Sequence, residues 1–252
     1  MEEDILLASG FIPVEDERIG QGYETCPLHH KALIKNAVSF AYALAPKDMA
    51  PVEHLRQMSH VREHTQAISC NWALFVFDEQ RFPVPAMLSA VVPALVARVQ
   101  TLIVASVRPC SPALFLGLDL LGVDQVYETP QPHDLAACLH AHEPGVILNF
   151  SAQPMPTHCS VQSFAPEHSA CTLHAALSPD QLAAYHDLFA CVHTEPDQPV
   201  YLAYADQPLA SAPRYTLSVP LLGCWVWETI HPDIFRFFRT SFSYAPVPGY
   251  DA

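Results

Sequence analysis

The chain has 252 residues, half of them hydrophobic, so it can bury the core of one large domain or two small ones. Twelve basic residues face 26 acidic ones, and the net charge of −14 disfavours nucleic acid and anionic membrane surfaces as partners. No apolar run reaches the roughly 18–20 residues of a membrane span without a proline or a charge. The N-terminus, Met1–Asp4, is acidic where a signal peptide is basic. We therefore expect a cytoplasmic protein that binds neither nucleic acid nor membrane.

The cysteine and glycine content argues against two further classes of protein, disulfide-rich scaffolds and standard nucleotide-binding proteins. The eight cysteines are scattered singly, with no CxxC pair and no secretory signal, which predicts free thiols rather than a disulfide framework. Only eight glycines stand against 24 prolines, and neither GxGxxG nor GxxxxGK[ST] occurs. Phosphate-binding loops need glycines where the backbone approaches the ligand closely. A standard nucleotide site is therefore not expected, and neither is NAD as a cofactor.

Residues 1–80 are predicted to form a helical region that packs on the core. Apolar periodicity predicts a helix from about His29 to Leu44. A second helix is predicted from Pro51, a residue tolerated in a first helical turn, to about Ile68. Trp72 to Phe77 is a predicted strand.

Residues 81–150 are predicted to form a parallel α/β core. Pro85–Val99 is an apolar helix, and Thr101–Ser106 is a β-branched run typical of a strand buried on both faces. Ser111 is the predicted N-cap of the next helix, and Gly122 its C′ glycine. Three more elements follow: a strand at Val123–Tyr127, a helix at Pro132–Ala141 and a strand at Val146–Phe150. Strands that alternate with helices of this length indicate right-handed parallel crossovers.

Residues 151–252 are predicted to form a smaller, mixed α/β part. Residues 151–167 are rich in Pro, Ser and Gln and predict a loop or linker. The remaining predicted elements are a helix from Ser178 to about Val192, strands at Val200–Tyr204 and Tyr215–Val219, and a tail at Ile234–Ala245 that begins as a helix.

The stretch from Pro85 to Leu139 resembles histidinol dehydrogenase. The shared pieces are Ala86–Ala94, Leu102–Ala105, Pro112-Ala113 and Leu121-Gly-Val-Asp-Gln-Val-Tyr127, and the stretch covers about a fifth of the chain. The resemblance implies an α/β fold: a parallel sheet flanked by helices, equivalent to a Rossmann-like dehydrogenase-type half. A Gly-Val-Asp junction between helix and strand also occurs in many other parallel α/β proteins.

Two shorter motifs follow in the family's order and supply the candidate site residues. Ala-Pro-Glu167-His168 is similar to the family's Glu–His pair, which implies acid–base roles for both side chains. Gly-Cys224-Trp and His231 are similar to the region that holds the family's zinc-binding aspartate and substrate-binding histidine. Tyr127 precedes the position of the loop that approaches the nucleotide, which makes it the candidate cofactor-binding residue. Cysteine can bind zinc as thiolate, so Cys224 is the candidate metal ligand and zinc the candidate metal.

The chain also departs from the family. Glu128-Thr-Pro-Gln-Pro132 stands where the family has a glycine-rich loop, and the spacing from His168 to Cys224 is longer. The family's second α/β half and two zinc ligands have no counterpart between Phe150 and Ala165. We therefore expect a relative of reduced size that acts as a non-catalytic binding or assembly module. A homo-oligomer or a protein partner would cover the apolar face that the missing half leaves.

The alternative hypothesis is an enzyme. It would be an oxidoreductase acting on a small alcohol or aldehyde, or a metal-dependent enzyme, that uses Glu167 and His168 on a small-molecule ligand. Other histidines and cysteines also lie close together, most densely at His168-x-x-Cys171-x-x-His174. The zincin pattern HExxH is absent, and a chain with 14 histidines produces such pairs by chance.

Overall fold

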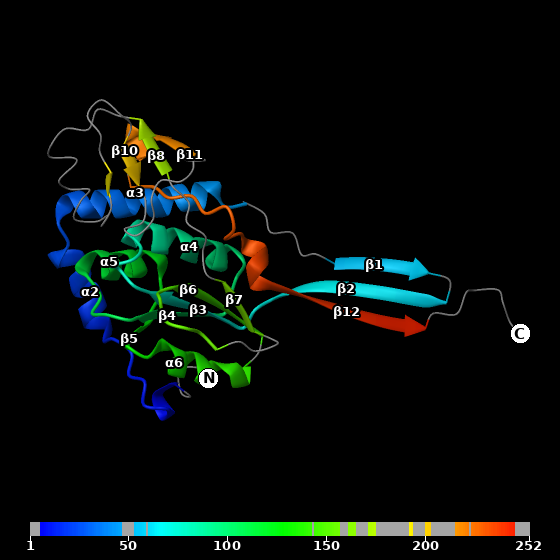
Figure 1. Cartoon of the computed structure of the whole chain (residues 1–252). Coiled ribbons are helices and arrows are strands. Elements are labelled where there is room, and N and C mark those ends of the chain that lie inside the picture. The colour runs from blue at the N-terminus through cyan, green and yellow to red at the C-terminus, as the bar shows by residue number, and fades with distance from the viewer. Residues whose placement is uncertain are drawn as a thin grey trace, which may run out of the picture.

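The computed structural model shows an α/β body from which a three-stranded arm projects (Figure 1). It describes residues 6–46, 53–58, 60–142, 144–156, 161–164, 171–174, 192–193, 200–202, 215–221 and 223–244. No helix in these ranges is long and apolar enough to cross a membrane.

The body is organised around a five-stranded sheet in which all neighbouring strands are parallel. The strand order is β5-β4-β3-β6-β7. The strands are β3 (Trp72–Phe77), β4 (Thr101–Ser106), β5 (Gln125–Glu128), β6 (Gly145–Phe150) and β7 (Val161–Phe164). The chain starts at the central β3, builds outward to β5, and returns to the other side of β3 through β6. The predicted parallel α/β fold is confirmed, although β7 lies where the sequence predicts a loop.

Helices cover both faces of this sheet. On one face lie α4 (Val84–Val96) and α5 (Pro112–Leu121), with α2 (Asp16–Thr25) and α3 (Leu28–Leu44) packed on them (Figure 1). On the other face lies α6 (Pro132–Leu139), followed by the short helix η1 (His140–His142). Alternate residues of β3 enter two separate clusters: Phe75 and Phe77 pack under α3–α5, and Trp72 and Leu74 pack beside α6. The body therefore buries a core on each side of the sheet.

The predicted boundaries of α5 are confirmed in detail. The Ser111 hydroxyl accepts a hydrogen bond from the Leu114 backbone N–H at 3.2 Å. At the other end, Gly122 adopts a left-handed conformation with φ +68°, which a residue with a Cβ adopts at a cost. Both signals act within a few residues, so they can be found without knowledge of the tertiary structure.

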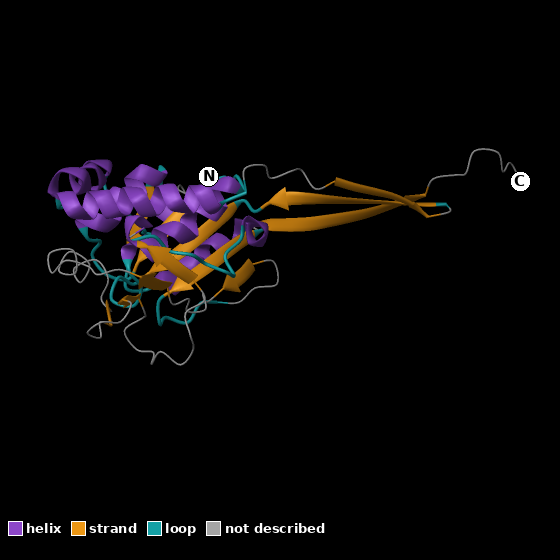
Figure 2. Cartoon of the chain, turned by 90° about the horizontal axis from the view of Figure 1, so that it is seen from above, coloured by secondary structure: helices purple, strands orange, loops and turns teal. Residues whose placement is uncertain are grey.

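The arm corrects two predictions. Pro51–Ile68 is not a helix; its described residues form the strands β1 (Glu53–Met58) and β2 (Val61–Ser69). The tail is not helical beyond η3 (Pro232–Phe235), because Arg236–Tyr244 forms β12, which pairs with β2 in antiparallel register. The arm is this antiparallel sheet, in the order β1-β2-β12. Figure 2 shows that it extends away from the body.

The base of the arm is fixed to the body by three contacts. The Cys70 backbone N–H donates to the Phe235 carbonyl at 2.9 Å, and the Ser69 hydroxyl donates to the Ala97 carbonyl at 2.6 Å. The Phe237 side chain packs against the core under α3–α5. The arm is thus continuous with the core at one end and exposed along the rest of its length.

A small mixed sheet forms from the C-terminal part of the chain, in the order β11-β8-β10-β9. Its strands are β8 (Cys171–His174), β9 (Val192–His193), β10 (Val200–Leu202) and β11 (Tyr215–Ser218), and η2 (Val219–Leu221) follows. The strands predicted at Val200–Tyr204 and Tyr215–Val219 are therefore present in shortened form. The helix predicted from Ser178 lies outside the described residues.

Candidate functional site

The carboxyl edge of the parallel sheet is the first place to look for a ligand site. In doubly wound sheets, ligands bind outside the carboxyl ends of the strands, where the chain reverses direction across the sheet. Here that point lies between β3 and β6. Polar residues end or follow the strands at this edge: Asp78 after β3, Ser106 at the end of β4, Glu128 at the end of β5 and Asn149 near the end of β6.

Glu128, at the end of β5, accepts hydrogen bonds from two other segments of the protein. Its carboxylate accepts hydrogen bonds from both terminal nitrogens of Arg18 on α2, at 2.8 and 2.9 Å. It also accepts from the Cys110 backbone N–H at 2.7 Å. Burial alone would raise the pKa of Glu128, but these bonds outweigh burial and hold its pKa below the ordinary value. Glu128 therefore ties α2 and the loop after β4 to the end of β5.

Two acidic residues in the loop after β3, Glu79 and Asp78, also accept hydrogen bonds from other groups of the protein. Glu79 accepts a hydrogen bond from the Ser111 backbone N–H at 2.9 Å, and burial raises its pKa. Asp78 accepts from the Arg108 side chain at 3.2 Å and from the Gln80 backbone N–H at 3.1 Å. These acidic side chains are held by groups of the protein itself, so they link the loops of the edge to one another.

Cys110 lies within the same group of contacts. Burial, with smaller contributions from the nearby carboxylates of Glu128 and Glu79, raises the pKa of its thiol to about 12. A thiol with such a pKa is protonated at neutral pH and is a weak nucleophile. This cysteine is therefore suited to packing rather than to covalent catalysis.

At the end of β6, polar and aromatic groups complete the edge. The Asn149 side chain accepts from the Ser151 backbone N–H at 2.9 Å and donates to the Gln153 carbonyl at 2.8 Å. The Phe150 ring lies 5.2 Å from that of Phe82 and 5.6 Å from that of Trp227, measured between centroids. The ends of β3 and β6 therefore meet over packed aromatic rings.

The two glutamates at this edge should respond to pH in opposite ways. The pKa of Glu128 is lowered in the folded protein, so its stabilising effect is present above its unfolded pKa and is lost as the pH falls through the folded value. The pKa of Glu79 is raised, so its ionisation opposes folding as the pH rises. We expect Glu128→Gln to lower the free energy of unfolding at pH 7 by about 1 kcal/mol, discounted for the half-exposed Arg18, and Glu79→Gln to raise it.

Urea unfolding of the wild type and both variants, from pH 4 to pH 7, measures these effects. The difference in the free energy of unfolding between Glu128→Gln and the wild type should shrink toward pH 4. The difference between Glu79→Gln and the wild type should also shrink. If both substitutions changed the free energy of unfolding equally and in the same direction, the opposite pKa shifts of Glu128 and Glu79 would be contradicted.

NAD is expected to bind only in the millimolar range or not at all. The loops that follow β3, β4 and β5 contain no glycine, and 128–132 reads Glu-Thr-Pro-Gln-Pro. Backbone N–H groups cannot approach a pyrophosphate closely there without displacing side chains. Calorimetric titration of the whole chain with NAD tests this, and a micromolar dissociation constant would contradict it.

The residues that the sequence predicts as a site do not form one group in the described part of the chain. Glu167 and His168 lie outside the described residues. His231 precedes η3 and is exposed, and its ring lies 3.2 Å from the Asp233 carboxylate. Tyr127 is buried in the cluster beside α6, whereas Cys224 is buried in the cluster under α3–α5, so the sheet separates them.

Cys224 is the candidate metal ligand, and its surroundings decide whether it can bind zinc. Its side chain is 0% exposed, and its thiol donates to the Asn36 carbonyl at 3.7 Å. Zinc takes three or four protein ligands. Within the ranges that the structure describes, no group of three or more His, Cys, Asp or Glu side chains could hold a metal ion. The described surroundings of Cys224 therefore do not fit zinc.

The arm presents a second candidate site, which the sequence analysis misses. The register places Phe242 opposite Glu63 and Tyr244 opposite Val61, and Met58 pairs with Val61 from the other side. Directly paired residues share one face of a sheet, and successive residues alternate between faces. Five large apolar side chains therefore lie on one face of the arm, which we call the aromatic face: Met58, Val61, Phe238, Phe242 and Tyr244. Arg56, Glu63 and Arg236 lie on the same face.

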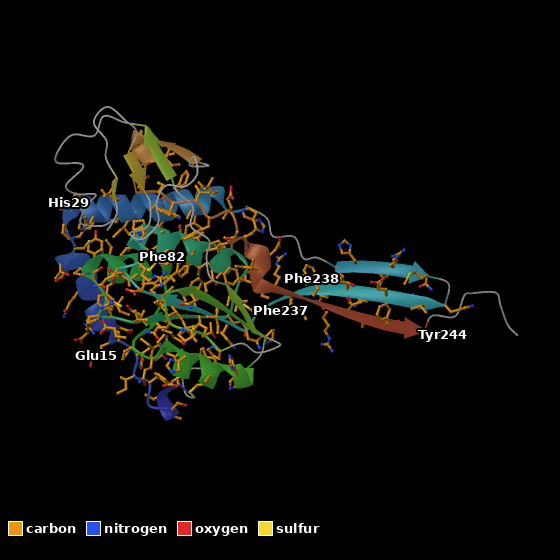
Figure 3. The ribbon with its side chains drawn as sticks, in the orientation of Figure 1. Glu15, His29, Phe82, Phe237, Phe238 and Tyr244 are labelled. Atoms are coloured by element: carbon orange, nitrogen blue, oxygen red, sulfur yellow. The ribbon has the colours of Figure 1, made fainter. Side chains whose placement is uncertain are left out.

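The aromatic face is open to solvent. The exposed fractions are 61% for Phe238, 66% for Phe242 and 74% for Tyr244. Figure 3 shows Phe238 near the base of β12 and Tyr244 at its far end. The opposite face is mainly polar along the outer arm, with Gln57, Arg62 and Ser243 in one row. The alternation of aromatic and polar residues along β12 could have predicted this face if the segment had been considered as a strand.

The chain matches no protein-family model, and no curated protein sequence matches it at a significant level. Among solved structures, it is weakly similar to the crystal structure of histidinol dehydrogenase from Elizabethkingia anophelis, with a TM-score of 0.42 and 13% sequence identity. The similarity covers 69% of this chain and 44% of that protein, so the chain spans less than half of that protein's length.

Proposed function

We propose that this chain is a histidinol-dehydrogenase-like protein of reduced size that acts as a non-catalytic binding or assembly module. The aromatic face of the arm is the surface that binds another protein. The observation that carries this proposal is the row of three aromatic side chains, Phe238, Phe242 and Tyr244, each more than half exposed on one face of β12.

The energetics favour a partner for this face. Burying a large apolar side chain contributes about 1.5–3 kcal/mol, so burying the three exposed aromatic rings against a partner would contribute several kcal/mol to binding. Contiguous apolar patches on a protein surface mark sites of interaction. The arm is held to the body by Cys70, Phe235 and Phe237, so the outer aromatic residues are not needed to fix its base.

The carboxyl edge of the sheet supports a role other than catalysis. Glu128, Glu79 and Asp78 are each occupied by hydrogen bonds from the protein's own loops. A substrate or nucleotide at this edge would have to displace those bonds. Binding through the arm requires no such rearrangement.

Site-specific photo-crosslinking tests the proposal. A photoreactive phenylalanine analogue replaces Phe242 on the aromatic face or, as a matched control, Ser243 on the opposite face, and the full chain is expressed in its source organism. Irradiation should give a covalent protein adduct from position 242 and much less from position 243. Absence of any adduct from position 242, and also from position 238, would overturn the proposed function.

A further inference from the structure

Helix α3 carries two neighbouring positive charges and no negative one. Lys31 and Lys35 are four positions apart, and the sequence of α3 contains neither Asp nor Glu. Side chains with this spacing lie next to each other on one face of a helix. The net charge of the whole chain is −14, so this pair is a local exception to its acidic character.

Both ammonium groups converge on a tyrosine of α2. The Nζ atoms of Lys31 and Lys35 lie 4.6 and 5.1 Å from the centroid of the Tyr23 ring. The Lys35 ammonium also donates a hydrogen bond to the Tyr23 hydroxyl at 3.5 Å. Because both nitrogens are close to one centroid, they are at most about 10 Å apart, about one Debye length at 0.1 M salt, and their charges repel each other.

No carboxylate in the described part of the chain forms an ion pair with either lysine. Arg18 on α2, by comparison, pairs with Glu128 at 2.8 Å. Glu24 follows Tyr23 directly and is exposed, but it also leaves the two lysines unpaired. The positive charge of the pair is therefore available to an anion from outside the chain.

Structural roles account for only part of this arrangement. A tyrosine ring attracts a cation, but a second ammonium group beside the first adds repulsion. Helix stability does not explain the pair either, because cations stabilise the C-terminal end of a helix. The last turn of α3 contains no basic residue, whereas Lys31 lies near its N-terminal end.

A phosphate monoester has the charge and the acceptors that fit this cluster. It carries about −1.5 to −2 charges at pH 7 and three acceptor oxygens. These oxygens can accept from both ammonium groups and from the Tyr23 O–H, whereas a carboxylate offers one negative charge for two positive ones. Tyr23 is 45% exposed, so the group can reach it from solvent.

We propose that Lys31, Lys35 and Tyr23 form a binding site for a phosphate monoester group. Lysine binds phosphate as a point charge, which suits two flexible side chains that converge on one hydroxyl. The site lies on α2 and α3, away from the arm in sequence and in its contacts, so it does not depend on the proposed function. The ester belongs to a phosphorylated small molecule or to a phosphorylated side chain of another protein.

Nuclear magnetic resonance titration of the full ¹⁵N-labelled chain with inorganic phosphate, at an ionic strength held constant with sodium chloride, tests the site. The backbone signals of Tyr23, Lys31 and Lys35 should shift and saturate, with a dissociation constant in the low-millimolar range. Lys31→Gln/Lys35→Gln should raise this constant about tenfold or more, because two charged donors are lost. Tyr23→Phe keeps the ring and removes the O–H, so it should raise the constant about threefold.

Arg62→Gln/Arg239→Gln is the matched control, since it removes two positive charges from exposed residues of the arm. It should leave the dissociation constant nearly unchanged. Far-ultraviolet circular dichroism shows whether each variant remains folded. The site would be overturned if the signals of the wild type did not saturate, or if both double variants weakened binding equally.

Two esters then identify the source of the phosphate group. The wild-type chain is titrated with glycerol phosphate and with a blocked tripeptide that contains phosphoserine. Saturable binding of either ester at the same signals supports the site, and the tighter of the two shows whether it takes small molecules or phosphorylated proteins. Binding of inorganic phosphate without binding of either ester would overturn the assignment to a monoester.

Discussion

Phe150→Ala is expected to lower the free energy of unfolding by about 3–5 kcal/mol, the range for removing a large side chain from a packed core. The Phe150 side chain is 0% exposed at the end of β6. Its ring contacts those of Phe77, Phe82 and Trp227, at centroid distances of 5.4, 5.2 and 5.6 Å. Alanine would leave a cavity where β3, β6 and the loops of the carboxyl edge meet.

Urea unfolding followed by circular dichroism measures this loss. Phe238→Ala on the arm is the control, because the same change at a mostly exposed phenylalanine should alter the stability of the dilute chain by about 0.5 kcal/mol or less. If Phe150→Ala cost no more than Phe238→Ala, the aromatic cluster would not support the junction of β3 and β6.

Gly145→Ala is expected to cost about 3 kcal/mol, although it adds one methyl group. Gly145 begins β6, and a Cβ built there would overlap the indole ring of Trp72 on the adjacent β3. Trp72 is fully buried, and its indole N–H donates to the His142 carbonyl at 2.8 Å. To admit the methyl group, the ring would have to move out of a packed site and weaken this bond.

A double-mutant cycle with Trp72→Phe gives the decisive measurement for this contact. The smaller ring removes the overlap, so the two substitutions together should cost clearly less than the sum of the single losses. Strictly additive losses in the cycle would show that the glycine is required for some other reason.

The body of the fold follows from local signals in the sequence. Ser111 and Gly122 bound α5 through hydrogen bonds and a backbone conformation that involve only neighbouring residues. The run Thr101–Ser106 is a strand as predicted, because a continuous β-branched segment suits a position buried on both faces. Such elements keep their preference when the rest of the chain is unknown.

The arm does not follow from local signals. Leu55, Met58 and Val61 have a spacing that fits the apolar side of a helix. In the structure Leu55 pairs with His64 on the polar face, whereas Met58 and Val61 lie on the aromatic face. The strand that decides between helix and sheet is β12, which pairs with β2 from far along the chain. A window of neighbouring residues contains no information about that pairing.

The same difference between local and long-range signals applies to the candidate site residues. His231, Tyr127 and Cys224 are chosen from short motifs, and their positions in the structure depend on elements that those motifs do not include. The hydrogen bonds from Arg18 to Glu128 join residues 110 positions apart. Such pairs are set by the packing of α2 on α5.

The distance in sequence between β2 and β12 has a consequence for synthesis on the ribosome. The Thr65 and Thr240 hydroxyls, 2.9 Å apart in the arm, belong to residues separated by 175 positions. At about 5–20 residues per second, β2 waits roughly 10–35 s for its partner strand. During that interval the hairpin of β1 and β2 has an unpaired edge that can pair with other chains. Nascent chains should therefore be most prone to aggregate, and most dependent on chaperones, just before the last residues of β12 emerge.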